Sequence, residues 1–446
     1  MTMQVPLPRG ISGSLATPKL EEYTLNQIFS QGALVSRPAC ELVTSVTGSP
    51  RGLFERGGKL CSVFGQTMYT GTTSLTSVGT VKGTGKIGTA KGFNHTAIAT
   101  GNTNYIFDGT TLSATTDVHL PVARSVAYVD RRFVWVNADG EAIFYSEVGN
   151  ADNVLATSFF DAETLPDENR LALNIRNDVF IFGVNSIERF RNVGTSSAPF
   201  VRVNNSIVSV GYVGGIVQTR DSFIFLGWDK EGGYQFYIHA DGGAVPVSTD
   251  AINEILNTQY TKEQLETVSG QRFNWRGVDC YAFEMPDRTF IFSRGSPSNW
   301  GYLSSGTPID LNYDRWGYQN AKLFNDTWFV QKSDGLYKLT TADADTSGDF
   351  SRGFKTFMRV GDESVFTLST LELSLAQNIE TSTVGLSLSK DGHLWSDVMY
   401  QDTGGEYVNR LRFMSPGGLG RYEGYAGIII RTTSSVPFSL TNMVAT

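Results

Sequence analysis

A strand–turn–strand unit that recurs along the chain is the feature that most restricts the fold. In one copy, residues 125–148 (SVAYVDRRFVWVNADGEAIFYSEV), short apolar runs alternate with polar turns at Asp130-Arg131 and Asp139-Gly140. Asp-Gly between runs rich in β-forming residues is a strong hairpin signal. We therefore expect three short strands here, joined by tight turns.

Related units follow at 171–192, 216–238, 273–293 and 321–341, with fainter copies at 59–72 and 93–112. Their first turns centre near Asp130, Asn177, Asp221, Gly277 and Asn325, which are separated by 47, 44, 56 and 48 residues. A period of about 40–50 residues with several strands per unit is typical of a β-propeller. Each small sheet can bury its faces only against neighbouring units. We therefore predict an all-β fold whose main part is a β-propeller of six or seven blades.

Residues 1–57 precede the clear repeats and are predicted to be an N-terminal arm with a ring-closing strand. A single helix is possible around residues 18–29. The propeller is expected to span 58–345. The stretch 342–353 (ADADTSGDFSRG) is small and polar and marks a domain boundary. After it, residues 346–446 hold five or more alternating strands, which favours a C-terminal β-sandwich-like domain.

One segment inside the repeats, 248–270 (STDAINEILNTQYTKEQLETVSG), predicts a short helical insertion. Asp250 can cap a helix that carries apolar residues at helical spacing, and Thr261 with Gln264 fits a capping box. The insertion is either a contact element for a partner or a helix that fills a gap between blades. The sequence leaves both alternatives open.

Composition excludes several classes of protein. The net charge of -8 over 446 residues argues against a protein that coats nucleic acid. The start has no basic region followed by an apolar core, so no signal peptide is predicted, and no apolar run approaches the length of a membrane-spanning helix. Cys40, Cys61 and Cys280 have no paired spacing and are predicted to be free thiols in a reducing cytoplasm during synthesis.

Two loops partly match ligand-binding motifs. Gly83–Gly88 (GTGKIG) fits the spacing of a dinucleotide-binding loop, but no strand–helix–strand pattern surrounds it, and Ile87 stands where a phosphate loop needs Ser or Thr. Asp343–Gly348 begins like a calcium loop, but the twelfth position is Phe354 instead of glutamate. We interpret the first as a glycine-rich connection and the second as a solvated linker.

The remaining candidate residues do not form a recognisable site. His95, His119, His239 and His393 have no metal-ligand spacing and no nucleophile beside them in the sequence. We therefore predict that the protein is not an enzyme, and we assign no catalytic, cofactor-binding or metal-ligating residues and no cofactor. Four tryptophans could line a ligand pocket at the propeller mouth, although core positions are commoner for such residues: Trp135, Trp228, Trp275 and Trp328.

Arginines gather in a blade turn and in the last strands: Arg131, Arg132, Arg410, Arg412, Arg421 and Arg431. The C-terminal region is nearly neutral overall, so a basic patch is not predicted. We expect these side chains to lie over apolar strands or pair with local acids. Use at a protein interface is the alternative, because the planar guanidinium suits it.

Four stretches, in this order, resemble one known family: residues 16–71, which lead into a first blade containing GGKL; DVFIFGVNSIERFRNVG at 178–194; the helix-plus-strand block 250–293 followed by Ser298-Asn299-Trp300-Gly301-Tyr302; and the closing VNRLRFMSPGGLGRYEGYAGIIIRTTSSVPFSL at 408–440. They resemble the packaged-DNA stabilisation, or tail hub (nozzle), proteins of short-tailed bacteriophages. The resemblance covers most of the chain.

The resemblance implies a structural virion protein of the tail, assembled in the host cell cytoplasm. Such proteins form a ring, a hexamer in the family, below the portal and its adaptor (head-to-tail connector) proteins. They complete the head, extend and close the DNA channel until genome ejection, and give attachment points to tailspikes or tail fibres and to a tail needle or tip. Duplex DNA passes transiently through the lumen.

Two other function classes stay open from the sequence. One is a receptor-binding or glycan-recognising propeller protein of the tail, because propellers host lectins and sialidases. The other is a propeller scaffold for protein binding, which would leave the sandwich-like ending unexplained.

Overall fold

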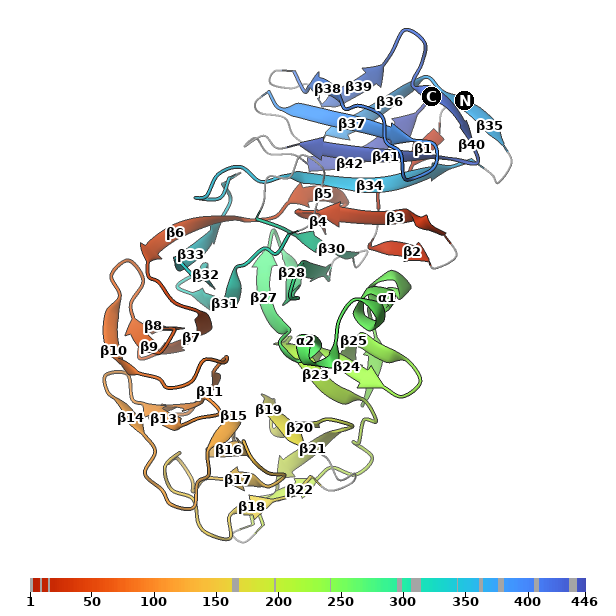
Figure 1. Ribbon diagram of the computed structural model, residues 1–446. Coiled ribbons are helices and arrows are strands. Elements are labelled where there is room, and N and C mark those ends of the chain that lie inside the picture. The colour runs from red at the N-terminus through yellow and green to blue at the C-terminus, as the bar shows by residue number, and fades with distance from the viewer. Residues whose placement is uncertain are drawn as a thin grey trace. The chain divides into compact units, whose positions relative to one another are not determined.

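The computed structural model describes residues 3–8, 10–14, 17–162, 168–195, 198–240, 242–294, 299–305, 314–342, 344–360, 364–375, 381–404, 409–432 and 439–446. Within this part the chain is nearly all β, with short helices only at 250–266 (Figure 1). Two compact units are present. Unit 1 contains residues 1–41, 248–317 and 339–446, and unit 2 contains residues 42–247 and 318–338.

In the described residues of unit 2, six four-stranded antiparallel sheets follow one another and form propeller blades (Figure 1). Their strands are β7 (Pro50–Arg56), β8 (Lys59–Phe64), β9 (Thr67–Thr70) and β10 (Thr76–Thr80); β11 (Gly88–Lys91), β12 (Thr96–Ala99), β13 (Asn104–Phe107) and β14 (Leu112–Ala114); β15 (Ala123–Val129), β16 (Arg132–Asn137), β17 (Ile143–Tyr145) and β18 (Phe159–Phe160); β19 (Asn169–Ile175), β20 (Asp178–Gly183), β21 (Ile187–Asn192) and β22 (Phe200–Arg202); β23 (Gly211–Gln218), β24 (Phe223–Asp229), β25 (Gly233–Ala240) and β26 (Gly243–Pro246); and β31 (Gln319–Phe324), β32 (Thr327–Lys332) and β33 (Gly335–Thr340), completed by β6 (Ala39–Ser45).

The apolar core of unit 2 lies between neighbouring blades. One cluster joins the β15–β18 and β19–β22 sheets, and another joins β19–β22 to β23–β26. In the second cluster, the rings of Phe182 and Phe223 meet edge to face with centroids 4.9 Å apart. The sheet of β31 packs in turn against that of β7, where Leu60 and Phe329 are buried together. Each blade therefore depends on its neighbours for burial, as the repeat spacing predicted.

Tight two-residue turns connect the first two strands of several blades. Asp130 and Arg131 have φ of 46° and 67°, and Asn325 and Asp326 have φ of 46° and 59°. Positive φ at both central residues defines the type I′ turn, whose twist matches that of the flanking strands. These turns fall where the sequence placed the repeat centres. Segments 125–148 and 171–192 lie in different sheets, which is the arrangement of a propeller rather than of one sandwich.

The type I′ turn at Asp130-Arg131 gives a first testable expectation. Because the left-handed backbone is strained for a residue with a Cβ, Arg131→Gly should raise the free energy of unfolding by about 1 kcal/mol. Urea denaturation of both proteins measures the change. Arg220→Gly is the matched control: Arg220 is also exposed in a blade turn but does not have positive φ, so glycine there should be slightly destabilising. Equal effects at the two positions would contradict the strain argument.

Unit 1 contains a β-sandwich of two sheets. The first has the order β39-β36-β42-β5-β4, with β1 paired to β42. Its strands are β1 (Met3–Val5), β4 (Gln27–Ser30), β5 (Ala33–Ser36), β36 (Thr370–Leu375), β39 (Arg410–Met414) and β42 (Ser439–Ala445). The second follows β3-β34-β41-β37-β38 and contains β2 (Ser12–Ser14), β3 (Thr17–Leu25), β34 (Arg352–Arg359), β35 (Val365–Leu368), β37 (Thr383–Ser389), β38 (Met399–Asp402), β40 (Gly420–Glu423) and β41 (Tyr425–Thr432). Side chains from both sheets form one buried cluster, which includes Leu34, Leu373, Ile428 and Met443.

A seventh four-stranded blade continues the second sheet of unit 1. It consists of β27 (Ser269–Trp275), β28 (Val278–Glu284), β29 (Thr289–Ser293) and β30 (Asn299–Leu303). Leu25 of β3 lies beside Tyr302 of β30 in a short parallel contact. Seven blades are therefore found in the described residues, within the predicted range of six or seven. The predicted domain boundaries after residues 57 and 345 stay a prediction.

The helix considered around residues 18–29 is wrong, because β3 and β4 occupy this segment. All residues from Tyr23 to Ser30 are buried, whereas an amphipathic helix would leave one face exposed. Asn26 turns the chain between the two strands with a φ of 54°. Pairing of β3 with β34 and of β5 with β42 supplies the backbone hydrogen bonds that local propensity does not specify.

The predicted helical insertion is present as α1 (Asp250–Thr258) and α2 (Lys262–Glu266). The capping box of Thr261 and Gln264 is confirmed. The cap of α1 is Thr249 instead of Asp250, which is the first helical residue. The hydroxyl of Thr249 also donates to the carbonyl of Ile11 at 2.6 Å, and α1 packs against β2 within unit 1. A partner contact by the insertion stays a prediction.

Candidate binding pocket

The glycine-rich loop at 83–88 is organised around an arginine and does not form a phosphate cradle. Arg51 of β7 is 1% exposed and donates to four backbone carbonyls: those of Gly65 at 2.9 Å, Val81 at 2.7 Å, Lys82 at 3.1 Å and Gly85 at 2.6 Å. Burial lowers the pKa of this guanidinium. A phosphate loop instead turns N–H groups toward its ligand. The carbonyls that converge here are occupied by a cation from the protein itself.

The interpretation of the calcium-like loop as a solvated linker is wrong at Asp345, which is buried and paired with an arginine. Both carboxylate oxygens of Asp345 accept from Arg37, at 3.0 and 2.7 Å, and one also accepts from the backbone N–H of Cys40 at 2.8 Å. Asp343 lies outside the described residues. Neither Asp345 nor Arg37 exposes its side chain. Among the described residues, no group of three or more His, Cys, Asp or Glu could hold a metal ion.

The four histidines lie apart in separate settings. His95 stacks on Phe133, with centroids 5.2 Å apart, and its Nε2 accepts from the backbone N–H of Ala151 at 3.0 Å. His239 stacks on Phe223, with centroids 4.9 Å apart. His119 and His393 are exposed. Burial, followed by the positive charge of Arg56, lowers the pKa of His95; burial and then Arg189 lower the pKa of His239.

The lowered pKa of His95 predicts a pH-dependent stability. The unfolded chain takes up this proton near the ordinary value of 6.5, whereas the folded chain takes it up only at lower pH. The unfolded state therefore binds more protons within this window, and stability should fall as pH drops below about 6.5. His95→Gln keeps a hydrogen-bond acceptor but cannot titrate. We expect it to reduce the fall in Tm between about pH 7 and about pH 5.5.

His119→Gln is the control, because His119 is exposed and should leave this pH dependence unchanged. Thermal melts of the three proteins at both pH values give the comparison. An unchanged pH dependence in the His95 variant would show that its proton uptake does not differ between the folded and unfolded states.

The tryptophans do not gather at one described site. Trp135 is fully buried in the cluster between the β11–β14 and β15–β18 blades. Trp275 is buried in unit 1 and donates its indole N–H to the carbonyl of Ser36 at 2.8 Å. Trp228 and Trp328 are half-buried on β24 and β32, in different blades of unit 2. The interpretation of Trp135 and Trp275 as core residues is confirmed.

Several of the arginines pair with local acids, as expected. Arg410 and Arg412 both bind the carboxylate of Glu372, at 3.4 and 2.7 Å. Arg132 lies 3.6 Å from Glu147 and over the ring of Tyr145. Arg431 donates to the hydroxyl of Ser387 at 2.7 Å. These contacts give most of the singled-out arginines a structural role within their own unit.

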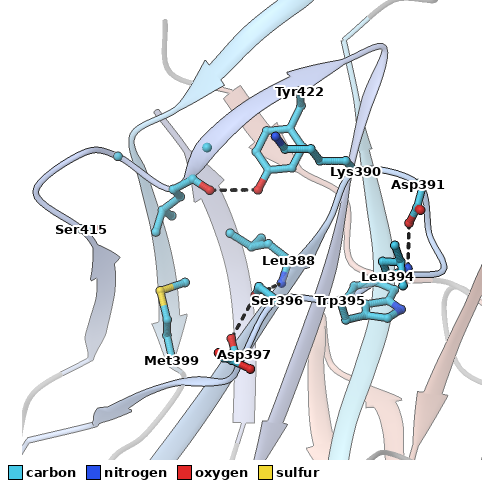
Figure 2. Close-up of a pocket in the computed structure, with 13 residues that line it drawn as sticks. Leu388, Lys390, Asp391, Leu394, Trp395, Ser396, Asp397, Met399, Ser415 and Tyr422 are labelled. Carbon is cyan, nitrogen blue, oxygen red and sulfur yellow. Dashed lines mark hydrogen bonds between the residues drawn. The ribbon is translucent and has the colours of Figure 1, made fainter.

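A cavity in the C-terminal sandwich is the feature that sequence reasoning missed. It has a volume of about 700 Å³ and lies between the loop after β37 and the segment that leads into β40 (Figure 2). Leu388, Leu419 and Tyr422 form its buried floor, at 5%, 8% and 5% exposure. Leu394 at its edge is 78% exposed, an unusual setting for a large apolar side chain. Trp395 and Met399 complete the apolar lining.

Local hydrogen bonds fix the shape of this cavity. Asp391 accepts from the backbone N–H of Leu394 at 2.8 Å (Figure 2). It also accepts from the backbone N–H of His393 at 2.9 Å. These bonds lower the pKa of its carboxyl group, so it stays ionised at neutral pH. Ser396 accepts from the N–H of Leu388 at 3.0 Å and donates to the carbonyl of Asp397 at 3.0 Å. The loop between β37 and β38 is therefore held by its own polar groups.

Two glycines leave room for aromatic side chains beside the cavity. At Gly420, which has a φ of 125°, an added Cβ would stand 3.0 Å from the hydroxyl oxygen of Tyr422. At Gly427, an added Cβ would stand 3.0 Å from Cη2 of Trp395. The hydroxyl of Tyr422 donates to the carbonyl of Leu419 at 2.9 Å (Figure 2). The cavity is thus formed before any ligand arrives.

A sequence signal for this pocket exists, although it is weak. In SKDGHLWSD, two large apolar residues, Leu394 and Trp395, stand in an otherwise polar turn that follows Asp391-Gly392. The other half of the pocket, from Ser415 to Tyr422, comes from a separate segment that folding brings beside it.

No helix in the described part of the chain is long and apolar enough to cross a membrane.

Comparison with known proteins found one family, one relative and several solved structures. The family model described as "Bacteriophage P22 Gp10, beta-propeller" matches residues 15–342. The "Tail hub protein gp10" of Salmonella phage P22 is 25% identical over 318 residues, which cover 67% of this chain and 65% of that protein. Solved structures with lower similarity include BamB from Moraxella catarrhalis, at 12% identity and a TM-score of 0.36, covering 76% of this chain and 97% of that one.

Another is the extracellular domain of the putative hybrid two component system BT4673 from B. thetaiotaomicron, at 8% identity and a TM-score of 0.45, covering 85% of this chain and 48% of that one. These two structural similarities are too low to support any functional statement. The chain spans about two thirds of the tail hub relative's length.

Proposed function

Because this chain belongs to the family described as "Bacteriophage P22 Gp10, beta-propeller", we propose that it is a structural tail hub protein of a short-tailed phage. The match over residues 15–342 is the observation on which the proposal depends, and it includes all seven blades from β7 to β33. In this role the protein is a component of the virion tail, is assembled in the host cytoplasm and has no enzymatic activity.

The finer part of the proposal is a ring, a hexamer by family resemblance, below the portal and its adaptor proteins. The blades support this role physically, because each is a four-stranded sheet that packs against its neighbours. A rigid unit that contacts its copies head to tail either closes into a ring or continues as a filament. The ring would extend the DNA channel and offer attachment points to tailspikes or fibres and to a needle or tip.

The net charge of the chain bears on how strongly such a ring would attract DNA. With -8 per copy, the protein should attract duplex DNA only weakly, so DNA can slide through the lumen. The genome would then be retained by a closed tip or plug, and salt-sensitive phosphate contacts would contribute little.

Particles assembled without this protein test the function. They should package DNA and then lose it, and purified protein added to fresh particles should stop the loss. DNA retained per particle, measured over time after nuclease treatment, is the readout. An unrelated β-propeller protein at the same concentration is the control. Stable genome retention without the protein, or tight salt-dependent binding of the purified chain to duplex DNA, would contradict the proposal.

A further inference from the structure

We propose that the cavity of the C-terminal sandwich is a docking pocket for a partner protein, and that it takes a large apolar side chain presented beside a lysine or arginine. The inference rests on the proposed function, in which other tail proteins attach to this chain. The residues that carry it are Leu388, Leu394, Trp395, Met399, Leu419 and Tyr422.

Size and surroundings favour an apolar guest. A volume of about 700 Å³ lies within the range of about 300–1,000 Å³ that is usual for ligand pockets. Apolar surface remains in water at the opening, where Leu394 is 78% exposed. Exposed apolar surface that continues into a pocket marks an interaction site rather than ordinary surface.

The polar atoms around the cavity argue against a sugar. The hydroxyls of Ser396 and Tyr422 donate to backbone carbonyls, and the carboxylate of Asp391 accepts from the turn that follows it, so the charged groups left for a ligand are Lys390 and Asp397 at the rim. A saccharide would bury several hydroxyl groups that need partners, and each unsatisfied group costs about 1–3 kcal/mol. An aliphatic or aromatic side chain makes no such demand on the pocket.

The charges around the opening determine which residue of the partner can stand next to the inserted apolar side chain. Asp391 and Asp397 contribute two carboxylates against one ammonium group, that of Lys390 (Figure 2). Asp397 is exposed, and no side-chain contact of its carboxylate is found among the described residues. A lysine or arginine next to the inserted side chain can therefore approach Asp397, whereas a glutamate there would meet repulsion.

The pocket is also rigid enough to act as a receptor. Asp391, Ser396 and Tyr422 hold it through bonds to nearby backbone, and the Trp395 ring rests on Gly427. A preformed site avoids part of the ordering cost that weakens flexible interfaces. Binding should therefore leave the loop between β37 and β38 unchanged and depend mainly on the fit of one side chain.

Blocked peptides test the proposal on the purified full-length chain. The probes are Ac-Gly-Trp-Lys-NH2, Ac-Gly-Trp-Glu-NH2 and Ac-Gly-Ala-Lys-NH2, with binding followed by saturation-transfer NMR and competition. The Trp-Lys peptide should bind, and the other two should bind at least about tenfold more weakly. Leu394→Asp and Ser415→Trp, which add a charge to the rim and fill the cavity, should each weaken binding by about tenfold or more.

Val365→Asp is the matched control, because Val365 is a 51% exposed apolar residue of the same sandwich that does not line the cavity. It should bind the Trp-Lys peptide as the original chain does. Asp397→Lys should reverse the preference between the Trp-Lys and Trp-Glu peptides. Since Leu394, Ser415 and Asp397 are exposed, these variants should fold normally, and thermal melts verify this.

The proposal is overturned if the Trp-Lys peptide does not bind, if the Ala-Lys peptide binds equally well, or if Leu394→Asp has no effect. Displacement of the peptide by chitotriose at a lower concentration would overturn it in favour of a glycan. Peptide binding is measured on the free chain and genome retention on particles. If the chain restores genome retention but does not bind the peptides, this inference is wrong and the proposed tail hub function is unaffected.

Discussion

Replacing Arg37 with methionine should lower the free energy of unfolding of unit 1 by about 3–5 kcal/mol. Arg37 is fully buried and pairs through both ends of its guanidinium with Asp345. It also donates to the carbonyl of Ser304 at 3.1 Å and to Oδ1 of Asn26 at 3.0 Å. Without the arginine, a buried carboxylate loses the cation that compensates its charge. Urea denaturation followed by tryptophan fluorescence measures the loss.

Two further variants separate the ion pair from simple packing. Arg37→Met combined with Asp345→Leu removes both charges and should recover part of the lost stability, because no uncompensated charge remains. Arg412→Ala breaks an ion pair with Glu372 in which the arginine is 56% exposed, and it should cost less than about 1 kcal/mol. If the double variant is no more stable than Arg37→Met alone, the buried charge is not the cause.

Arg51→Met should lower the free energy of unfolding of unit 2 by more than about 3 kcal/mol. The substitution removes donors from four backbone carbonyls in and before the glycine-rich loop, and methionine cannot replace them. Because hydrogen bonds to a charged donor are worth about 1.5–3 kcal/mol each, partial compensation by water still leaves a large loss. Denaturation under the same conditions as for Arg37 gives the value.

Lys86→Met is the informative control for Arg51, since Lys86 holds the place of the lysine in a phosphate loop. In this structure it is an exposed residue whose ammonium group contacts Oδ1 of Asn320 at 3.2 Å. Its replacement should change stability by less than about 0.5 kcal/mol. A large loss in the lysine variant and a small one in the arginine variant would refute this account of the loop.

The parts of the fold that were predictable are those specified by local sequence. The turns at Asp130-Arg131 and Asn325-Asp326 and the capping box at Thr261 are signalled by neighbouring residues, so the repeat and the insertion could be located. The segment around Tyr23–Ser30 could not, because β3 pairs with β34 more than 300 residues later in the sequence, where Thr24 lies opposite Phe354. Local pattern favours a helix there, and long-range pairing overrides it.

The same distinction explains what was missed at the candidate sites. The spacing of GTGKIG suggests a ligand loop, but its partner Arg51 lies about thirty residues earlier and carries no motif. The pocket joins Trp395 to Tyr422 across two segments, and only the first carries a signal, the apolar pair Leu394 and Trp395 in a polar turn. A site can be recognised from one sequence when its residues are consecutive. A surface that forms only when two distant segments pair leaves no such pattern.

The position of β6 has a consequence for synthesis of the chain. β6 (Ala39–Ser45) is the fourth strand of the sheet formed by β31, β32 and β33, and Val46 donates to the carbonyl of Asp334 just beyond it. On the ribosome, roughly 290 residues must follow Ser45 before this partner exists, which takes about 15–60 s at about 5–20 residues per second. During that time β6 has no partner strand to pair with. Nascent chains should therefore need shielding from aggregation until translation is nearly complete, and slow codons before residue 335 would prolong the exposure.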